Sequence, residues 1–233
     1  MQRAYTLEEL AKFLNRSSKE IQKLAEKDIL KGRKVQGKWN FALPDVVLWM
    51  ENEMTRLAEE ETAQLEEVVS SDEEIVDEVS LDALLDVNAI DLQFAAKTKA
   101  SVLREMAKLA ENTGKLWDAE QMAEALRERE EMASTALDVG AAILHPRRPR
   151  PDLLGEDFLA LGVSPRGVPF GGGFDNLTDV FFLLCCQTDA NYLRALGRLA
   201  RVLRQPGFLD SLRECSDPYE VKKLIVAAER ELN

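Results

Sequence analysis

Two short stretches near the start of the chain carry apolar residues at the three- and four-residue spacing of amphipathic helices. Their apolar stripes consist of Leu7, Leu10, Ala11 and Leu14, and then of Ile21, Leu24 and Ala25. Each stripe begins with the serine or threonine and the glutamate of a capping box, which are Thr6 with Glu9 and Ser17 with Glu20. Because only Asn15 and Arg16 separate the two predicted helices, the pattern indicates a helix-turn-helix.

The next part of the chain has the pattern of a two-stranded hairpin. Leu30 to Val35 and Lys38 to Phe41 flank the pair Gln36-Gly37, and glycine supplies the positive φ that a tight hairpin turn requires. Pro44 then marks the first turn of a further helix, which contains Val46, Val47 and Trp49. The sequence therefore predicts a helix-turn-helix, a basic two-stranded wing and a closing helix, in that order.

Apolar positions continue along the closing helix as Val46, Met50, Met54 and Leu57. This stripe has two interpretations. It can join two copies of the module in a homodimer, or it can pack against the module's own core. The spacing fits both.

Beyond residue 80, short apolar runs alternate with helical patterns, an order typical of an α/β fold. The runs are Ile90 to Phe94, Ala141 to Leu144, Phe158 to Val163 and Val180 to Cys186. The helical stripes consist of Val102, Leu103, Met106 and Leu109, of Met122 and Leu126, of Leu193, Leu196, Leu199 and Leu203, and of Val221, Leu224, Ile225 and Ala228. We expect the last two stripes to pack on the sheet.

Charge divides the 233 residues into three parts, although the whole chain has a net charge of −12. Residues 1–50 hold 10 basic and 6 acidic residues, residues 51–86 hold 1 and 14, and residues 87–233 hold 19 and 22. The stretch from Val69 to Ser80 has no aromatic, basic, glycine or proline residue, which is typical of a solvated, disordered linker. We therefore predict a module at 1–57, an acidic linker at 58–80 and a larger domain at 81–233.

Composition also limits the compartment and the chemistry. No apolar run is long enough for a membrane-spanning helix, and the N-terminus lacks the order of a signal peptide. Three cysteines form neither a disulfide framework nor a metal-binding spacing, and the adjacent Cys185 and Cys186 are expected in the core. Gly171-Gly172-Gly173 matches no nucleotide-binding motif and predicts a flexible turn. We expect a soluble cytoplasmic protein without a metal or a cofactor.

Residues 4–54 resemble the excisionase-like, MerR-related winged helix-turn-helix family, through the segment YTLEELAKFLNRSSKEIQKLAEKDILKGRKVQGKWNFALPDVVLWM. Members of that family bind DNA with the second helix in the major groove and the wing against the backbone. The resemblance implies contacts by Arg16, Ser18, Lys19 and Lys23 on the helix and by Arg33, Lys34 and Lys38 on the wing. The lysines favour nonspecific phosphate contacts, since they lack the two-pronged guanine recognition of arginine. The alternative is a solvated basic face on a module that binds protein.

The single histidine, His145, lies at the end of an apolar run. Gly140 to Leu144 precede it and Pro146-Arg147-Arg148-Pro149 follow it, so it ends a predicted strand at a basic loop suited to an anion. Imidazole is largely unprotonated at pH 7 and can act as a nucleophile toward a phosphoryl group. The residue type alone leaves open that His145 is an ordinary core or surface histidine.

The segment REREEMASTALDVGAAILHPRRP resembles the phosphorylation motif of type 2 phosphotransferase-system enzyme IIA domains, the fructose, mannitol and nitrogen-regulatory group. The resemblance extends over about residues 80–233 and implies a mixed sheet with flanking helices. It implies His145 as the phosphoryl acceptor, Arg129 as the cation near the phosphate, and Ser134 and Thr135 as donors that line the pocket. Arg147 can add positive charge or remain a solvated loop residue.

Two positions depart from the family pattern. Leu144 stands directly before the histidine, where the family usually has proline, and Pro146 follows it instead. Tyr192-Leu193 replaces a common His-Leu pair at the start of the later helix. A tyrosine hydroxyl can donate or accept a hydrogen bond but cannot become an imidazolium, so Tyr192 is a site neighbour and not a catalytic residue.

Together these patterns predict a cytoplasmic regulator that is a phosphocarrier and not a stand-alone enzyme. His145 would accept a phosphoryl group from an HPr-type carrier and couple it to DNA or partner binding. The alternative function is a DNA- or protein-binding regulator whose IIA-like domain is an interaction platform that carries no phosphate.

Overall fold

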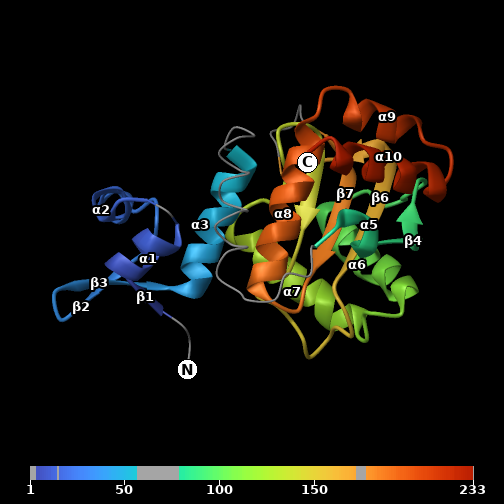
Figure 1. Cartoon of the computed structure of the whole chain (residues 1–233). Coiled ribbons are helices and arrows are strands. Elements are labelled where there is room, and N and C mark those ends of the chain that lie inside the picture. The colour runs from blue at the N-terminus through green and yellow to red at the C-terminus, as the bar shows by residue number, and fades with distance from the viewer. Residues whose placement is uncertain (1–3, 15, 57–78, 172–176, 233) are drawn as a thin grey trace.

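The computed structural model describes residues 4–14, 16–56, 79–171 and 177–232. Figure 1 shows a small N-terminal part and a larger C-terminal part, with helix α3 (Leu43–Arg56) between them. The predicted acidic linker falls mostly on 57–78 and lies outside the described residues. Among the residues described, no helix is both long and apolar enough to span a bilayer.

The N-terminal part opens with strand β1 (Ala4–Thr6), helix α1 (Leu7–Phe13) and helix α2 (Ser18–Glu26). Both predicted capping boxes are confirmed. Glu9 accepts a hydrogen bond from the Thr6 backbone N–H at 2.8 Å while Thr6 Oγ1 accepts one from the Glu9 N–H. Ser17 and Glu20 exchange the same pair of bonds, so each helix start satisfies its free N–H groups locally.

Strands β2 (Arg33–Val35) and β3 (Lys38–Ala42) form the predicted hairpin. Gln36 and Gly37 have φ values of 50° and 80°, so both central residues of the turn adopt the left-handed conformation of a tight hairpin. The first strand of the hairpin begins at Arg33 and not at Leu30, whose side chain is instead buried in the core. Strand β1 was not predicted; it pairs antiparallel with β3 and makes the sheet three-stranded, in the order β1-β3-β2.

Helix α3 begins at Leu43, one residue before the predicted start at Pro44, and buries Val46, Val47, Trp49 and Met50. Trp49 lies under the guanidinium of Arg16, at 5.4 Å from the ring centroid, and so belongs to the N-terminal part. Helix α3 also packs against a helix of the larger part. The stripe proposed for a homodimer therefore has a partner in the same chain at Met50. The Met54 side chain and Leu57 lie outside the described residues, and the homodimer stays a prediction.

The larger part contains a four-stranded mixed sheet in the order β4-β6-β7-β5. Its strands are β4 (Leu85–Asp91), β5 (Ala141–Leu144), β6 (Phe158–Val168) and β7 (Thr178–Cys185). β4 pairs parallel with β6, β6 antiparallel with β7, and β7 parallel with β5. The expected mixed sheet of the α/β fold is confirmed, and the predicted core cysteines Cys185 and Cys186 are buried.

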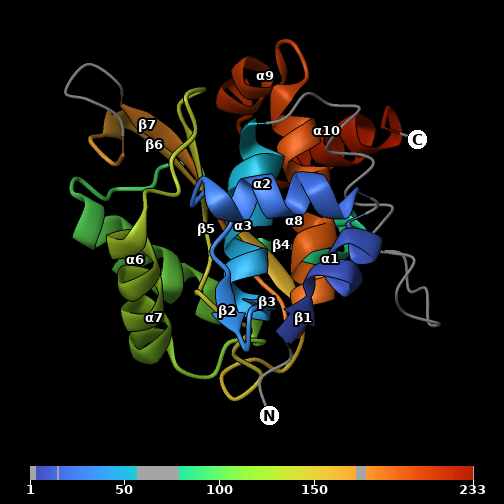
Figure 2. The ribbon, with the colours of Figure 1, turned by 90° about the vertical axis from the view of Figure 1, so that its left-hand side faces the viewer.

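Helices cover both faces of this sheet (Figures 1 and 2). One face carries α6 (Lys99–Ala110) and α7 (Ala119–Met132), joined by a 3-10 turn at Glu111–Thr113, and the other carries α8 (Asp189–Arg204), α9 (Phe208–Glu214) and α10 (Pro218–Arg230). Successive side chains of a strand point to opposite faces of the sheet. Phe181 and Leu183 therefore pack in the core beneath α6 and α7, whereas Phe182 and Leu184 pack in the core beneath α8.

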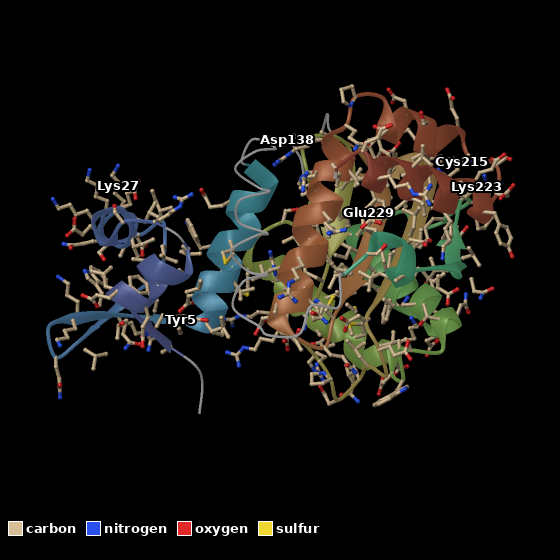
Figure 3. The ribbon with its side chains drawn as sticks, in the orientation of Figure 1. Tyr5, Lys27, Asp138, Cys215, Lys223 and Glu229 are labelled. Carbon is tan, nitrogen blue, oxygen red and sulfur yellow. The ribbon has the colours of Figure 1, made fainter. Side chains whose placement is uncertain are left out.

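The start of the larger part is fixed by a buried carboxylate on α10. Glu229, labelled in Figure 3, accepts hydrogen bonds from the Leu81 N–H at 2.8 Å and from Ser80 Oγ at 3.1 Å, and it pairs with Arg198 of α8 at 3.2 Å. It thereby caps the short helix α5 (Leu81–Leu84) and links it to α8.

Two elements of the larger part differ from the sequence prediction. The apolar run Ile90 to Phe94 is not one strand, because β4 already ends at Asp91 and Phe94 turns into the core beside Phe181, with ring centroids 5.9 Å apart. The short helix α9 was not predicted.

Candidate functional site

The single histidine lies at the carboxyl end of the edge strand β5. His145 follows Leu144 directly and is only 4% exposed. Its Nδ1 lies 3.1 Å from the Pro146 carbonyl oxygen. Because a carbonyl can only accept, the neutral ring carries its proton on Nδ1, and Nε2 holds the lone pair. The proline that follows the histidine therefore helps to fix the tautomer through its backbone oxygen.

Arg129 comes from the last turn of α7 and is 3% exposed. Its Nη1 donates to the Ala133 carbonyl at 2.9 Å, which holds the guanidinium at the end of the helix. Burial first, and then the positive charge of Arg129, lower the pKa of His145 from 6.5 to about 3; the Pro146 hydrogen bond and the charge of Glu130 act in the opposite direction. The imidazole is therefore neutral at physiological pH, and its Nε2 lone pair is not protonated.

Ser134 and Thr135 lie in the turn that follows α7, and both donate to Glu130. Ser134 Oγ donates to Glu130 Oε1 at 2.9 Å, while the Thr135 N–H and Oγ1 donate to Oε2 at 2.9 and 2.6 Å. Lys99 of α6 pairs with the same carboxylate at 2.8 Å. The donors predicted to line a phosphate pocket are thus directed at a buried protein carboxylate.

The chain after α7 returns along β5 and brings the turn next to the histidine strand. The Ile143 N–H donates to the Thr135 carbonyl at 3.2 Å, and Ala136 pairs with Ala142 in an isolated antiparallel bridge. Gly171 packs closely against this turn, and an added Cβ there would lie 1.8 Å from Ser134 Oγ. Strand pairing therefore fixes Arg129, Thr135 and His145 in one small region.

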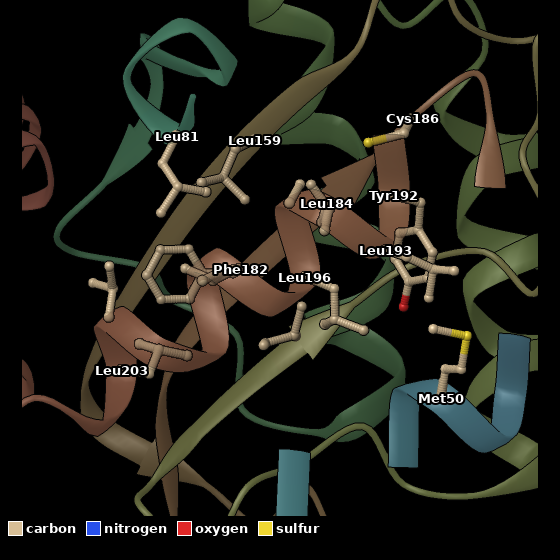
Figure 4. Packing of buried hydrophobic residues seen from close by; sticks show 14 of the residues in the cluster. Met50, Leu81, Leu159, Phe182, Leu184, Cys186, Tyr192, Leu193, Leu196 and Leu203 are labelled. Atoms are coloured by element: carbon tan, nitrogen blue, oxygen red, sulfur yellow. The ribbon is translucent and has the colours of Figure 1, made fainter. Parts of the chain in front are cut away.

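Tyr192 lies in the first turn of α8, whose N-cap is Thr188. Its ring centroid is 4.9 Å from that of His145, with an angle of 34° between the rings, and its side chain is 6% exposed. Figure 4 shows Met50 of α3 near the tyrosine, and both residues belong to one apolar cluster. Tyr192 is thus a site neighbour that lies near both the histidine and helix α3.

Most of the remaining predicted site residues are exposed. Arg147 lies on the surface of the loop after His145 and is not part of the buried group. Of the residues assigned to DNA, Lys19, Lys23, Arg33, Lys34 and Lys38 are exposed and Arg16 and Ser18 are partly buried. Lys27, labelled in Figure 3, marks the end of α2 on the side away from the larger part.

An open pocket of about 680 Å³ lies elsewhere, between the end of β4 and α6. Its charged lining includes Lys97, Arg104, Lys108, Asp91 and Glu105, and it contains none of the predicted phosphate-site residues. With both signs of charge mixed on an open surface, this pocket has no pattern that selects a phosphate.

Two residues that organise the site, Glu130 and Lys99, were not among the predicted site residues. Glu130 stands next to Arg129 in the motif, and a carboxylate four and five positions before Ser134 and Thr135 was the signal for its contacts. Lys99 had no such signal, because it reaches Glu130 from another helix.

The family model for the phosphoenolpyruvate-dependent sugar phosphotransferase system, EIIA 2, matches residues 83–228. The fructose-specific EIIABC component of Bacillus subtilis is 29% identical over 150 residues, which is 64% of this chain but only 21% of that protein. The nitrogen regulatory protein of Bradyrhizobium diazoefficiens is 30% identical over 131 residues, which is 55% of this chain and 82% of that protein.

A solved structure agrees with the fold. The nitrogen regulatory protein IIA-Ntr from Neisseria meningitidis superposes with a TM-score of 0.55 at 24% identity, over 62% of this chain and 97% of that one. The family match covers more than half of the chain and includes β4 to β7, Arg129 and His145. The chain therefore belongs to the EIIA type 2 family of the phosphotransferase system.

Proposed function

We propose that this chain is a regulatory phosphocarrier of a phosphoenolpyruvate-dependent phosphotransferase system. His145 accepts a phosphoryl group from an HPr-type carrier, and the phosphorylated state changes the binding of DNA or of a partner. The observation that carries the proposal is the neutral imidazole of His145, oriented by the Pro146 carbonyl and within reach of the charge of Arg129.

The chemistry needs a nucleophile and a positive charge more than it needs acid–base catalysis. The Nε2 lone pair forms the new N–P bond while the N–P bond of the donor phosphohistidine breaks, and the bonding electrons return to the donor ring. The Nδ1 proton stays on the ring, held by the Pro146 carbonyl. The Arg129 guanidinium offsets charge on the phosphoryl oxygens during the transfer.

Phosphoenolpyruvate, enzyme I and a cognate HPr-type carrier supply the test. The full chain is expected to gain an acid-labile phosphate, and His145→Ala is expected to gain none. Arg129→Gln should take up phosphate about a hundredfold more slowly, the usual effect of removing one charge-stabilising donor. Uptake of phosphate by His145→Ala would overturn the site assignment.

A second candidate function follows from the burial of the site. His145 is 4% exposed, and the Ser134 and Thr135 donors are directed at Glu130. These observations favour an interaction platform that retains the fold and carries no phosphate. The same assay separates the two functions, because a demonstrably phosphorylated carrier that transfers nothing to the chain would support the platform and overturn the phosphocarrier.

For the N-terminal part we propose a winged helix-turn-helix that binds DNA through α2 and the β2–β3 hairpin. The support is the order of elements and the exposed basic residues, with Lys34 held 4.9 Å over the Trp39 ring. Lysine contacts to phosphates make binding steeply dependent on salt. Affinity for a duplex of mixed sequence, measured at two salt concentrations, should fall as salt rises, and an absence of binding at low salt would overturn the proposal.

A further inference from the structure

The proposed phosphoacceptor is closed to another protein in this structure. Phosphoryl transfer between proteins requires the acceptor nitrogen to lie about 3 Å from the phosphorus. It must also lie in line with the bond from the phosphorus to the donor nitrogen. His145 has 4% of its surface exposed. A carrier protein cannot bring a second imidazole to a side chain that is covered to this extent.

The N-terminal part contacts the helix whose tyrosine covers His145. Tyr192 lies over the His145 ring, and Met50 of α3, which is fully buried, packs beside Tyr192 in Figure 4. Helices α3 and α8 are in contact, and one apolar cluster runs from the helix-turn-helix through α3 into α8. Seen from the N-terminal side in Figure 2, α3 lies in front of α8.

We propose that the contact between α3 and α8 is an autoinhibitory dock, and that α3 must leave α8 before a phosphocarrier protein can reach His145. This inference rests on the proposed function of His145.

The dock also gives phosphorylation a route to the N-terminal part. A phosphoryl group on a side chain carries about −1.5 to −2 charges, and a histidine ring that keeps its Nδ1 proton offsets one of them. That charge would lie under Tyr192, one side chain away from the apolar contact with Met50. Desolvating it is costly, so phosphorylation favours the undocked state. By linkage, docking disfavours the phosphorylated state to the same extent.

Access to His145 can be measured without any phosphotransfer. Diethyl pyrocarbonate acylates a neutral imidazole, and the chain has one histidine, so mass spectrometry of the peptide that carries His145 gives one rate in tag-free full-length protein. Met50→Asp places a charge in the dock. Leu48→Asp is the matched control, since Leu48 lies on the same helix but is not packed in the apolar cluster.

Met50→Asp should acylate His145 about tenfold faster than wild type, which corresponds to a dock worth about 1.4 kcal/mol. Leu48→Asp should match wild type, and the milder Met50→Ala should lie between. Amide hydrogen exchange gives two controls. Protection of α8 measures whether α3 is docked, and protection of β7 measures whether the larger part is folded. Undocking of α8 without faster acylation, or an α8 that stays docked in Met50→Asp, would overturn the inference.

Transfer from a phosphorylated HPr-type carrier then separates this inference from the proposed function. A faster transfer to Met50→Asp than to wild type supports both. Equal transfer rates in the two proteins keep the phosphocarrier and overturn the dock. If Met50→Asp is acylated faster but no variant gains phosphate, the dock still controls access to His145. The proposed phosphocarrier function is then overturned.

Discussion

The two parts of the molecule handle charge in opposite ways. In the N-terminal part the basic side chains of α2 and the hairpin, such as Lys23 and Lys38, lie on the surface. In the larger part Arg129, Glu130 and His145 are buried within one segment of chain that runs from α7 to β5. The first arrangement leaves charge in water, where salt screens it, whereas the second fixes charge in the interior.

Because of this difference, the two sets of charges affect binding and stability differently. Exposed lysines attract an anionic partner at little cost to folding, because each remains hydrated. A buried charge lowers stability unless it is paired, and it acts at a fixed distance when it is. The same buried residues that order the His145 region therefore contribute to stability, and substitutions in the two parts should differ in size and kind.

The largest expected effect is at Glu130. Its carboxylate accepts hydrogen bonds from Ser134, from Thr135 and from Lys99, and Glu130→Gln turns an amide NH₂ toward these donors. We expect a loss of about 3 kcal/mol in the free energy of unfolding, against less than about 0.5 kcal/mol for the exposed Lys23→Gln. Urea unfolding measures both, and similar small losses would remove the contrast between the parts.

The next effect is a pH dependence that belongs to His145. The unfolded chain binds a proton at a pKa near 6.5, whereas burial and Arg129 lower the pKa of the folded state to about 3. Stability from this group is therefore full above pH 6.5 and is lost as pH falls. Between pH 7 and pH 5 wild type should lose about 2 kcal/mol more than His145→Asn does.

Urea unfolding of both proteins at the two pH values measures this difference. Lys38→Asn serves as the control and should follow wild type, since Lys38 is exposed. Curves for wild type and His145→Asn that run parallel would mean that the histidine titrates in the folded state as it does in water.

Two glycines distinguish crowding from backbone strain. Gly171→Ala should cost about 2 kcal/mol, because the new Cβ meets Ser134 Oγ at 1.8 Å. Gly37→Ala should cost about 1 kcal/mol, because its φ of +80° is unfavourable for other residues although no atom lies within 4 Å. Adding Ser134→Ala to Gly171→Ala should recover part of the lost free energy of unfolding, whereas adding it to Gly37→Ala should recover none. Equal recovery in the two double variants would contradict the assignment of crowding to Gly171 and backbone strain to Gly37.

The smallest effect on stability is expected on the wing. Lys38→Ala should change the free energy of unfolding by less than about 0.5 kcal/mol. It should lower the slope of the logarithm of DNA affinity against the logarithm of salt by about 1, because one phosphate contact is lost. Lys97→Ala, on the larger part, is the matched control and should leave that slope unchanged.

Local signals predicted much of the fold. The capping boxes at Thr6 and Ser17 and the Gln36-Gly37 turn depend only on residues a few positions apart, and all three are confirmed. Strand β1 was missed because three residues carry no periodicity and its structure comes from pairing with β3. Helix α9 was missed for the same reason of length, since its seven residues bury Phe208, Leu209 and Leu212 in a core built by other elements.

The site divides in the same way. The motif resemblance pointed to Arg129, His145 and Tyr192, which the structure brings together. It did not assign the Ser134 and Thr135 donors to Glu130, because that pairing depends on how the chain turns after α7. It also gave no sign that Met50 packs beside Tyr192, since this contact joins two parts that each have their own sequence pattern.

The most direct measurement is the location of a phosphoryl group after incubation with phosphoenolpyruvate, enzyme I and a cognate HPr-type carrier. Peptide mapping by mass spectrometry under alkaline conditions, which preserve phosphohistidine, should place one phosphate on His145 of the full chain, with a higher yield at early times in Met50→Asp. A phosphate on another residue, or none on either protein while the carrier is phosphorylated, would contradict the account.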